Sequence, residues 1–191
     1  MTALTLQMPS STKLSDEQFF ELCRINRDIR IERTANGELI LMPPTGGETG
    51  TRNAGINAQI WIWNESKGLG KVFDSSTAFK LPNGANRAPD ASWVQLERWN
   101  ALTPEQKEKF PPICPDFVVE LRSKTDRLSV LQAKMREYAD NGTKLGWLIN
   151  RKDNQVEVYS LDQDVKVLTG PATLSGGSVL PGFELTLKGI L

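Results

Sequence analysis

Apolar and polar residues alternate along several stretches of the chain, and this pattern predicts β-strands. Ile29 and Ile31 alternate with polar neighbours in DIRIER, and Asn36-Gly37 separates this segment from ELILM. Because Asn-Gly is a strong signal for a tight hairpin turn, the two segments predict a β-hairpin. The run DFVVELR, residues 116–122, has the strongest strand character. Further strands are predicted as a pair within residues 70–84, and at 90–94, 145–150, 156–161, 165–170 and 180–187.

Helical spacing and capping residues predict helices among these strands. Ser15 and Gln18 form a capping box at the start of the first helix, and Gly142 lies just beyond the last. The predicted helices span residues 15–27, 51–65, 103–110 and 126–140. This mixed order predicts an α+β fold, an α/β sandwich around one mixed β-sheet. No repeat or long linker divides the chain, so residues 1–191 are predicted to form a single domain.

Composition narrows the class of protein. The chain has 191 residues and is 39% hydrophobic, and no apolar run approaches the roughly 20 residues that span a membrane. The N-terminal segment MTALTLQMPSS has no basic start and no long apolar stretch, so we expect no secretory signal and a cytoplasmic protein. Cys23 and Cys114 lack a C-x-x-C partner and are expected to be reduced.

The absence of histidine is the most informative feature of the composition. It excludes Ser-His-Asp and Cys-His catalysis, histidine general bases and histidine-ligated zinc. Hydrolytic chemistry would therefore depend on carboxylates, lysine, tyrosine and a hard metal ion held by oxygen. Basic and acidic residues balance at 23 each, so a nucleic-acid binder would have to concentrate its positive charge locally.

Glu120 lies within the strand predicted at residues 116–122, on the face opposite its three apolar core positions. A buried, ionised carboxylate needs a cationic partner or a metal ion. Two interpretations therefore stay open for Glu120: a metal ligand, or a structural ion pair with Arg122 or Arg136.

Asp90 follows Pro89 at the head of the strand predicted at residues 90–94. Taken alone, Pro-Asp is more typical of a turn than of a functional site. Asp90 and Glu120 together would place two acids on neighbouring strands, where they could share a hard cation that polarises a phosphodiester and activates water. We therefore predict that their carboxylates lie within a few ångströms of each other.

Basic residues gather after the strand at residues 116–122, against a single acid, Asp126. They are Arg122, Lys124, Arg127, Lys134 and Arg136. The cluster could form the positive patch that DNA binding needs, or an ordinary solvated helix face. Lys134 and Tyr138, four residues apart, lie on one side of the predicted helix. The Lys134 ammonium could therefore reach across the sheet or extend into solvent.

Several short motifs, in order, resemble the Uma family of putative restriction endonucleases, within the PD-(D/E)XK nuclease superfamily. The resemblance covers the chain from about Asp28 to Phe183. Its motifs are NGELILMPPTGGE, Pro89-Asp90, PDFVVELRS, LxxKxxxYADNGxxLGWLI, VEVY and LPGFEL. The resemblance implies a restriction-endonuclease-like mixed β-sheet flanked by helices, with an N-terminal helix and β-hairpin.

The same resemblance implies a site. Asp90 and Glu120 would bind Mg²⁺ (or Mn²⁺), Lys134 would replace the superfamily lysine of the strand, and Glu48 would be a further metal ligand. Tyr138 would support this site. Arg122 departs from the family pattern because it occupies the E-x-K position, and arginine cannot serve as a general base.

Two further departures from the family pattern concern neighbouring positions. Lys124 stands where many relatives carry proline, and Thr49 where relatives often carry histidine.

The sequence thus favours a metal-dependent DNA endonuclease, with Arg122, Lys124, Arg127 and Arg136 on the DNA. A homodimer is expected from the symmetry of duplex DNA. Two alternatives from other classes stay open. One is an inactive nucleic-acid-binding module of the same fold, and the other is a structural or interaction protein with ion-paired acids.

Overall fold

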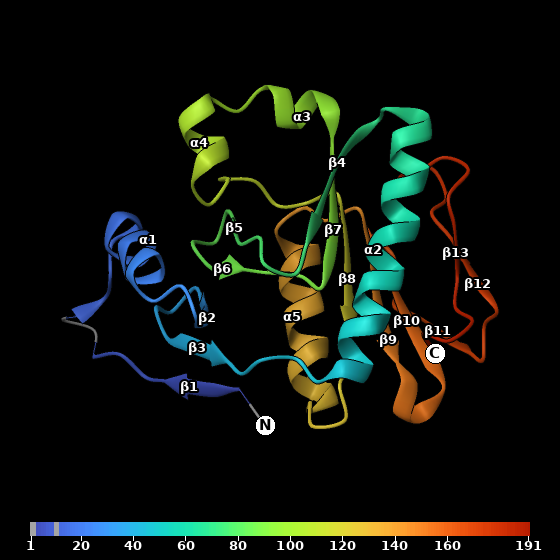
Figure 1. Ribbon diagram of the computed structural model, residues 1–191, viewed down its shortest axis with the longest axis horizontal. Helices are drawn as coiled ribbons and strands as arrows, with labels where there is room; N and C mark the ends of the chain where they lie inside the picture. Colours follow the sequence, from blue (N-terminus) through green and yellow to red (C-terminus); the bar gives the residue numbers. More distant parts are fainter. Residues whose placement is uncertain (1–2, 10–11) are drawn as a thin grey trace.

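A six-stranded sheet forms the centre of the protein. The computed structural model describes residues 3–9 and 12–191, and the sheet has the order β11-β10-β9-β8-β7-β4 (Figure 1). Its strands are β4 (Gly70–Asp74), β7 (Ala91–Gln95), β8 (Phe117–Leu121), β9 (Leu145–Asn150), β10 (Gln155–Ser160) and β11 (Lys166–Thr169). Only β8 and β9 run parallel, and the other neighbours are antiparallel. The predicted mixed sheet is therefore confirmed.

Two helices cover opposite faces of this sheet: α2 (Gly47–Lys67) and α5 (Leu128–Asp140) (Figure 1). The alternation of side chains along β8 explains the arrangement. Val119 packs in one core cluster with residues of α2, and Val118 packs in a second cluster with residues of α5. The strand is thus buried on both faces, and any polar side chain within it must find its partner inside the protein.

A second, five-stranded sheet lies beside α5, in the order β1-β3-β2-β6-β5 (Figure 1). Its strands are β1 (Leu4–Leu6), β2 (Arg30–Arg33), β3 (Leu39–Met42), β5 (Phe79–Lys80) and β6 (Asn86–Arg87). The expectation of one sheet is corrected here, because β2 pairs with β6, with Arg33 opposite Asn86. An isolated hairpin is only marginally stable in water, so the predicted hairpin β2–β3 gains stability from these further strands.

Capping boxes mark the starts of two helices, and the first of them was predicted. Ser15 and Gln18 form the capping box of α1 (Asp16–Ile25), and Thr103 with Gln106 forms that of α4 (Pro104–Glu108). Helix α2 begins four residues before the predicted start at residue 51, and its first turn includes Gly47 and Gly50. The short helices α3 (Leu96–Asn100) and η2 (Arg151–Asp153) have too few residues for a helical period to be visible.

The C-terminal segment closes the α2 side of the main sheet. Strands β12 (Thr173–Ser175) and β13 (Glu184–Thr186) form a separate two-stranded sheet. Phe183 and Leu185 are buried in the core cluster that α2 shares with β8. Among the described residues, no helix combines the length and the apolar character that a membrane span requires.

Candidate active site

Asp90 and Glu120 lie at the same end of two neighbouring strands. Strands β7 and β8 pair antiparallel with Ala91 opposite Val119. Continuing this register by one residue places Asp90 opposite Glu120, and residues opposite each other in an antiparallel pair share a face. The negative charge of Asp90 is one of the causes that raise the pKa of Glu120. The two predicted acids are therefore brought together on neighbouring strands.

Hydrogen bonds fix the orientation of Asp90. Its Oδ1 accepts from the Nδ2 of Asn53 at 3.0 Å, and its Oδ2 accepts from the backbone N–H of Leu121 at 2.8 Å. Asn57, one helical turn after Asn53, donates to the Asp90 backbone carbonyl at 3.1 Å. Burial raises the pKa of Asp90 and the bond from Leu121 opposes this, with a net rise. Asp90 is still partly exposed as a residue, so solvent can approach it.

Glu120 is only 4% exposed, and its Oε1 has two donors from α5. The Tyr138 hydroxyl donates to it at 3.1 Å, and the Lys134 ammonium lies at 2.8 Å. Burial raises the pKa of Glu120 to about 7, with a further contribution from Asp90, although Lys134 acts in the opposite direction. Because of this raised pKa, the Glu120 carboxyl is partly protonated near neutral pH.

The cation beside Glu120 is neither of the two arginines considered as structural partners. Arg122 pairs with Asp153 at 3.0 Å and donates to the Asn150 side chain at 2.9 Å. Arg136 is exposed on the outer side of α5. The specific alternative of a Glu120 pair with Arg122 or Arg136 is therefore replaced by a contact with Lys134.

Lys134 is the lysine that reaches the acids, and only 12% of its side chain is exposed. Its Nζ contacts Glu120 Oε1 at 2.8 Å, Glu32 Oε1 at 2.8 Å and the Ala88 carbonyl at 3.2 Å. Burial alone would lower the pKa of Lys134, but Glu120 and Glu32 raise it above its usual value. Lys124, by contrast, is exposed in the turn between β8 and α5.

Glu32, a residue of the second sheet, belongs to this site although the sequence analysis did not single it out. It is 2% exposed and accepts hydrogen bonds from Lys134, from the Ala88 N–H and from Arg87. Burial raises the pKa of Glu32, but Lys134 and Arg87 outweigh it and the net change is downward. In the sequence Glu32 is one polar position of an alternating strand, so it carries no sign of burial.

Asn53 and Asn57 were also missed. Their spacing of four residues on one helix face was the available signal, because it allows both amides to reach one neighbour. Glu48, in contrast, pairs with Arg52 of its own helix, and 84% of its side chain is exposed. The described contacts do not bring Glu48 to the two acids.

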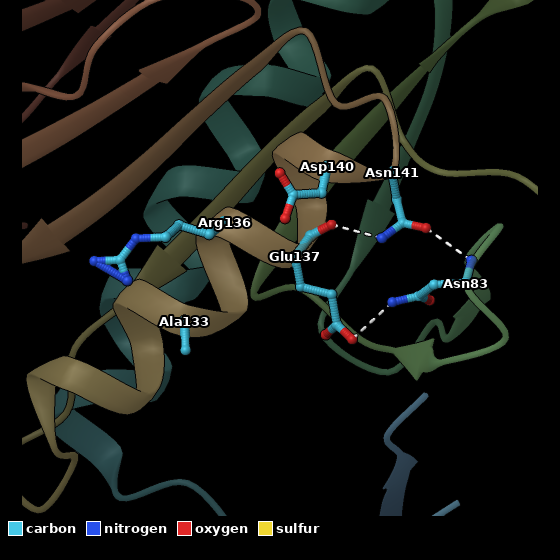
Figure 2. A pocket seen from close by; sticks show the side chains of 6 residues that line it. All are labelled: Asn83, Ala133, Arg136, Glu137, Asp140 and Asn141. Atoms are coloured by element: carbon cyan, nitrogen blue, oxygen red, sulfur yellow. Dashed lines mark hydrogen bonds between the residues drawn. The ribbon is translucent and has the colours of Figure 1, made fainter. Parts of the chain in front are cut away.

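Of the basic cluster, Lys124, Arg127 and Arg136 are exposed. Arg136 borders a hollow of about 470 Å³ between α5 and the Asn83 loop, and its guanidinium extends away from Asn83 (Figure 2). Glu137 and Asn141 hold Asn83 by hydrogen bonds across this hollow (Figure 2). The hollow lies outside the acid site, since neither Asp90 nor Glu120 lines it.

The oxygen atoms around Asp90 and Glu120 suit a hard divalent cation. Within the described residues, no group of three or more acidic, cysteine or histidine side chains has the arrangement of a complete metal site. Asn53 adds a further oxygen, because its buried Oδ1 has no hydrogen-bond partner while its Nδ2 holds Asp90. Two carboxylates, a free amide oxygen and water would form an all-oxygen ligand set of the kind that Mg²⁺ binds.

A mixed sheet between two helices, with acids at the ends of adjacent strands, defines a restriction-endonuclease-like fold. A crystal structure of "a putative nuclease belonging to DUF820" from Anabaena variabilis ATCC 29413 has this fold, with a TM-score of 0.74 and 19% sequence identity. The match covers 92% of this chain and 96% of that one. A comparison with curated proteins finds no match.

The family is defined by sequence as well as by fold. The Uma2 family model, described as "Putative restriction endonuclease", matches residues 16–188. The chain belongs to the Uma2 family, as its motifs predicted, and this family description places it among the nucleases.

Proposed function

We propose that the protein is a metal-dependent DNA endonuclease, which hydrolyses phosphodiester bonds with a metal-activated water. One observation carries the proposal: two acids meet at the ends of adjacent strands, and a buried lysine ammonium lies 2.8 Å from one of them. Structural acids are usually neutralised by their neighbours, whereas here the pKa of Glu120 is raised to about 7 by burial and by the nearby acid. Strongly shifted pKa values of this origin are characteristic of functional sites.

Asp90 and Glu120 would hold Mg²⁺ or Mn²⁺, which would polarise the phosphate and make a bound water nucleophilic. Asn53 keeps Asp90 in place through Nδ2, and its Oδ1, which has no hydrogen-bond partner, would be available to a water or cation. The Tyr138 hydroxyl holds Glu120 from the α5 side. Each acid is thus oriented by a fixed neighbour on a different helix, as a rigid metal site requires.

Lys134 would act as a cation and hydrogen-bond donor. Its raised pKa keeps the ammonium protonated at neutral pH, so it cannot remove a proton from water. A fixed positive charge next to the scissile phosphate stabilises the negative charge that develops in the transition state. Arg122 has no such role in this proposal, because its guanidinium is bound to Asp153 and Asn150.

DNA would bind along the exposed basic side chains near the start and outer face of α5. Lys124, Arg127 and Arg136 are exposed there, and phosphates bind such side chains with the release of counterions. Of the four basic residues predicted to contact DNA, Arg122 is the weakest candidate. Cutting both strands of a duplex would need two active sites, for which we propose a homodimer.

A cleavage assay with a matched pair of variants tests this function. Asp90→Asn and Asp116→Asn each neutralise one aspartate beside β8, but Asp116 lies at the opposite end of the strand. With Mg²⁺ or Mn²⁺ and plasmid or single-stranded DNA, Asp90→Asn should lose at least about a hundredfold in rate, since even supporting residues of metal sites cost 10–100-fold. Asp116→Asn should cleave at nearly the natural rate while folded.

Two outcomes contradict the proposal. Cleavage that persists in Asp90→Asn would remove Asp90 from the site. Salt-dependent DNA binding without cleavage by the natural protein, on either substrate and with either metal ion, would favour an inactive DNA-binding module.

A further inference from the structure

Glu32 connects the second sheet to the acid site. Its carboxylate is buried between three donors: Lys134 Nζ at 2.8 Å, the Ala88 N–H at 3.0 Å and Arg87 Nη1 at 3.1 Å. Lys134 lies 102 residues further along the chain, so the contact forms only when the second sheet docks against α5. A buried carboxylate with this many donors is rigidly held.

The contact belongs to a longer row of alternating charges. Glu120 contacts Lys134, Lys134 contacts Glu32, and Glu32 contacts Arg87. Arg87 in turn pairs with Glu137 at 2.5 Å, one helical turn after Lys134 on α5. The Glu32 carboxylate is therefore also held by Arg87, a residue of β6 that is itself paired with Glu137 of α5. The position of its carboxylate does not depend on Glu120.

The three protons of the Lys134 ammonium match its three acceptors. Glu120 is one of the two proposed metal ligands, whereas Glu32 and the Ala88 carbonyl are not. Without Glu32, Glu120 would be the only carboxylate among the described residues in contact with Lys134, and the lysine would then compete with any cation for that acid. With Glu32 present, Lys134 keeps two acceptors when Glu120 turns to another ligand.

We propose that Glu32 is the positioning residue of the site: it holds Lys134 beside Glu120 and leaves the Glu120 carboxylate available for a metal ion. This inference rests on the proposed function. The competing role for Glu32 is purely structural, as the residue that joins the two sheets through Arg87. The two roles differ in whether the effect of Glu32 requires Lys134.

A double-mutant cycle separates the two roles. Glu32→Gln keeps the shape and the Ala88 contact, and it is compared in the natural background and in Lys134→Met. Glu157→Gln is the control, because Glu157 is also a buried glutamate that contacts α5, through Gln132 at 2.7 Å, away from the acids. Urea unfolding of every variant checks that it is folded at the assay temperature.

The first measurement is steady-state cleavage, separated into kcat and KM. In the natural background, Glu32→Gln should lower kcat by about 10–100-fold with little change in KM, as expected for a residue that orients a catalytic group. In Lys134→Met it should lower the remaining kcat by less than about threefold, because coupled residues are not additive. Glu157→Gln should change neither value.

The second measurement is calorimetric titration with Mn²⁺ alone. Glu32→Gln should weaken Mn²⁺ binding by about tenfold in the natural background, because Lys134 is then left to pair with Glu120. In Lys134→Met the same substitution should change the affinity by less than about threefold. This titration requires no cleavage, so it tests the inference separately from the nuclease activity.

Equal losses in both backgrounds would overturn the inference and leave Glu32 a structural role through Arg87. No loss in either would do the same. If Glu32→Gln unfolds, Glu32→Asp replaces it in the same cycle. Because its side chain is shorter, Glu32→Asp should also lower kcat only where Lys134 is present.

If the natural protein cleaves but the cycle shows no coupling, this inference fails alone. If the natural protein neither binds Mn²⁺ nor cleaves, the proposed function fails with it.

Discussion

Two buried acids on one strand show what separates a structural carboxylate from one suited to chemistry. Asp116 directly precedes β8 and Glu120 is four residues later, and they are 0% and 4% exposed. Asp116 contacts two cations, Arg98 at 2.8 Å and Lys144 at 2.9 Å, and its Oδ2 accepts from the Gln95 N–H. One negative charge is therefore surrounded by two positive charges.

Glu120 has the opposite surroundings. It shares the single ammonium of Lys134 with Glu32, and Asp90 lies opposite it on β7. Of the other cations near this site, Arg87 contacts Glu32 and Glu137, and the charge of Arg30 acts on Asp90. The Asp116 end of β8 thus has an excess of cations over acids, whereas the Glu120 end has an excess of acids. Under the proposed function, a divalent cation would bind at the Glu120 end.

The largest expected difference is in stability without metal. In chelator at pH 8, Asp116→Asn should lower the free energy of unfolding by about 1–3 kcal/mol, because Arg98 and Lys144 lose their shared carboxylate. Both cations are partly exposed, which limits the loss. Glu120→Gln should leave the free energy of unfolding unchanged or raise it by about 1 kcal/mol, because like charges are relieved and Lys134 keeps Glu32. Urea unfolding measures both.

The opposite order of stabilities would contradict this comparison. If Glu120→Gln loses about 3–5 kcal/mol, the Lys134 ammonium depends on Glu120 as its structural partner. Glu120 would then resemble Asp116, and the interpretation of Glu120 as a metal ligand would fail. Addition of Mg²⁺ gives a second check, because only the natural protein should be stabilised by it.

A smaller effect is expected in the pH dependence. The pKa of Glu120 is about 7 in the folded protein and 4.5 for an ordinary glutamate, so the folded state holds its proton more tightly. Glu120 therefore contributes stability that is fully present below about pH 4.5 and is lost as the pH rises through about 7. Glutamine at this position does not titrate. The stability of Glu120→Gln relative to the natural protein should therefore increase from pH 5 to pH 8.

The expected size is about 1–3 kcal/mol, from roughly 1.4 kcal/mol for each unit of pKa difference. Urea unfolding in chelator at pH 5, 6, 7 and 8 measures it. A difference that stays constant over this range would mean that Glu120 is ionised throughout and is neutralised as fully as a structural acid.

Much of the main sheet could be predicted because its elements have strong local patterns. The alternation in β8, the period of α5 and the capping box of α1 all appear in the structure. Strand β6 could not be predicted, because it has two residues and forms by pairing with β2. Its position depends on the packing of distant segments, which no short window of sequence contains.

The site divides in the same way. The positions of Asp90, Glu120 and Lys134 followed from strand spacing and family motifs, and the structure brings these residues together. Glu32 could not be found, because it reaches Lys134 from another sheet and from 102 residues away. Arg122 was grouped with the exposed basic residues because its partner Asp153, which follows β9, is distant in sequence. Local spacing identified the candidate residues of the site but not which cations are already paired.

The smallest expected effect concerns the cations at the two ends of β8. Arg127 and Arg136 lie beyond the Glu120 end and are exposed, whereas Arg98 and Lys144 are bound to Asp116. Replacing Arg127 and Arg136 by Gln should reduce the slope of log K against log salt by roughly one to two units, since each lost phosphate contact removes about 0.9. DNA binding, followed by fluorescence anisotropy at salt concentrations from about 50 to 300 mM, measures this slope.

Replacing Arg98 and Lys144 by Gln is the matched control, because it removes the same number of positive charges at the other end of the strand. These two cations already neutralise Asp116, so their loss should leave the slope unchanged as long as the variant is folded. If the control variant lowers the slope as much as the Arg127 and Arg136 variant, DNA binding depends on the net charge of the protein and not on the outer face of α5. If only the control lowers it, the DNA-binding face lies at the Asp116 end, far from the acids that would cut it.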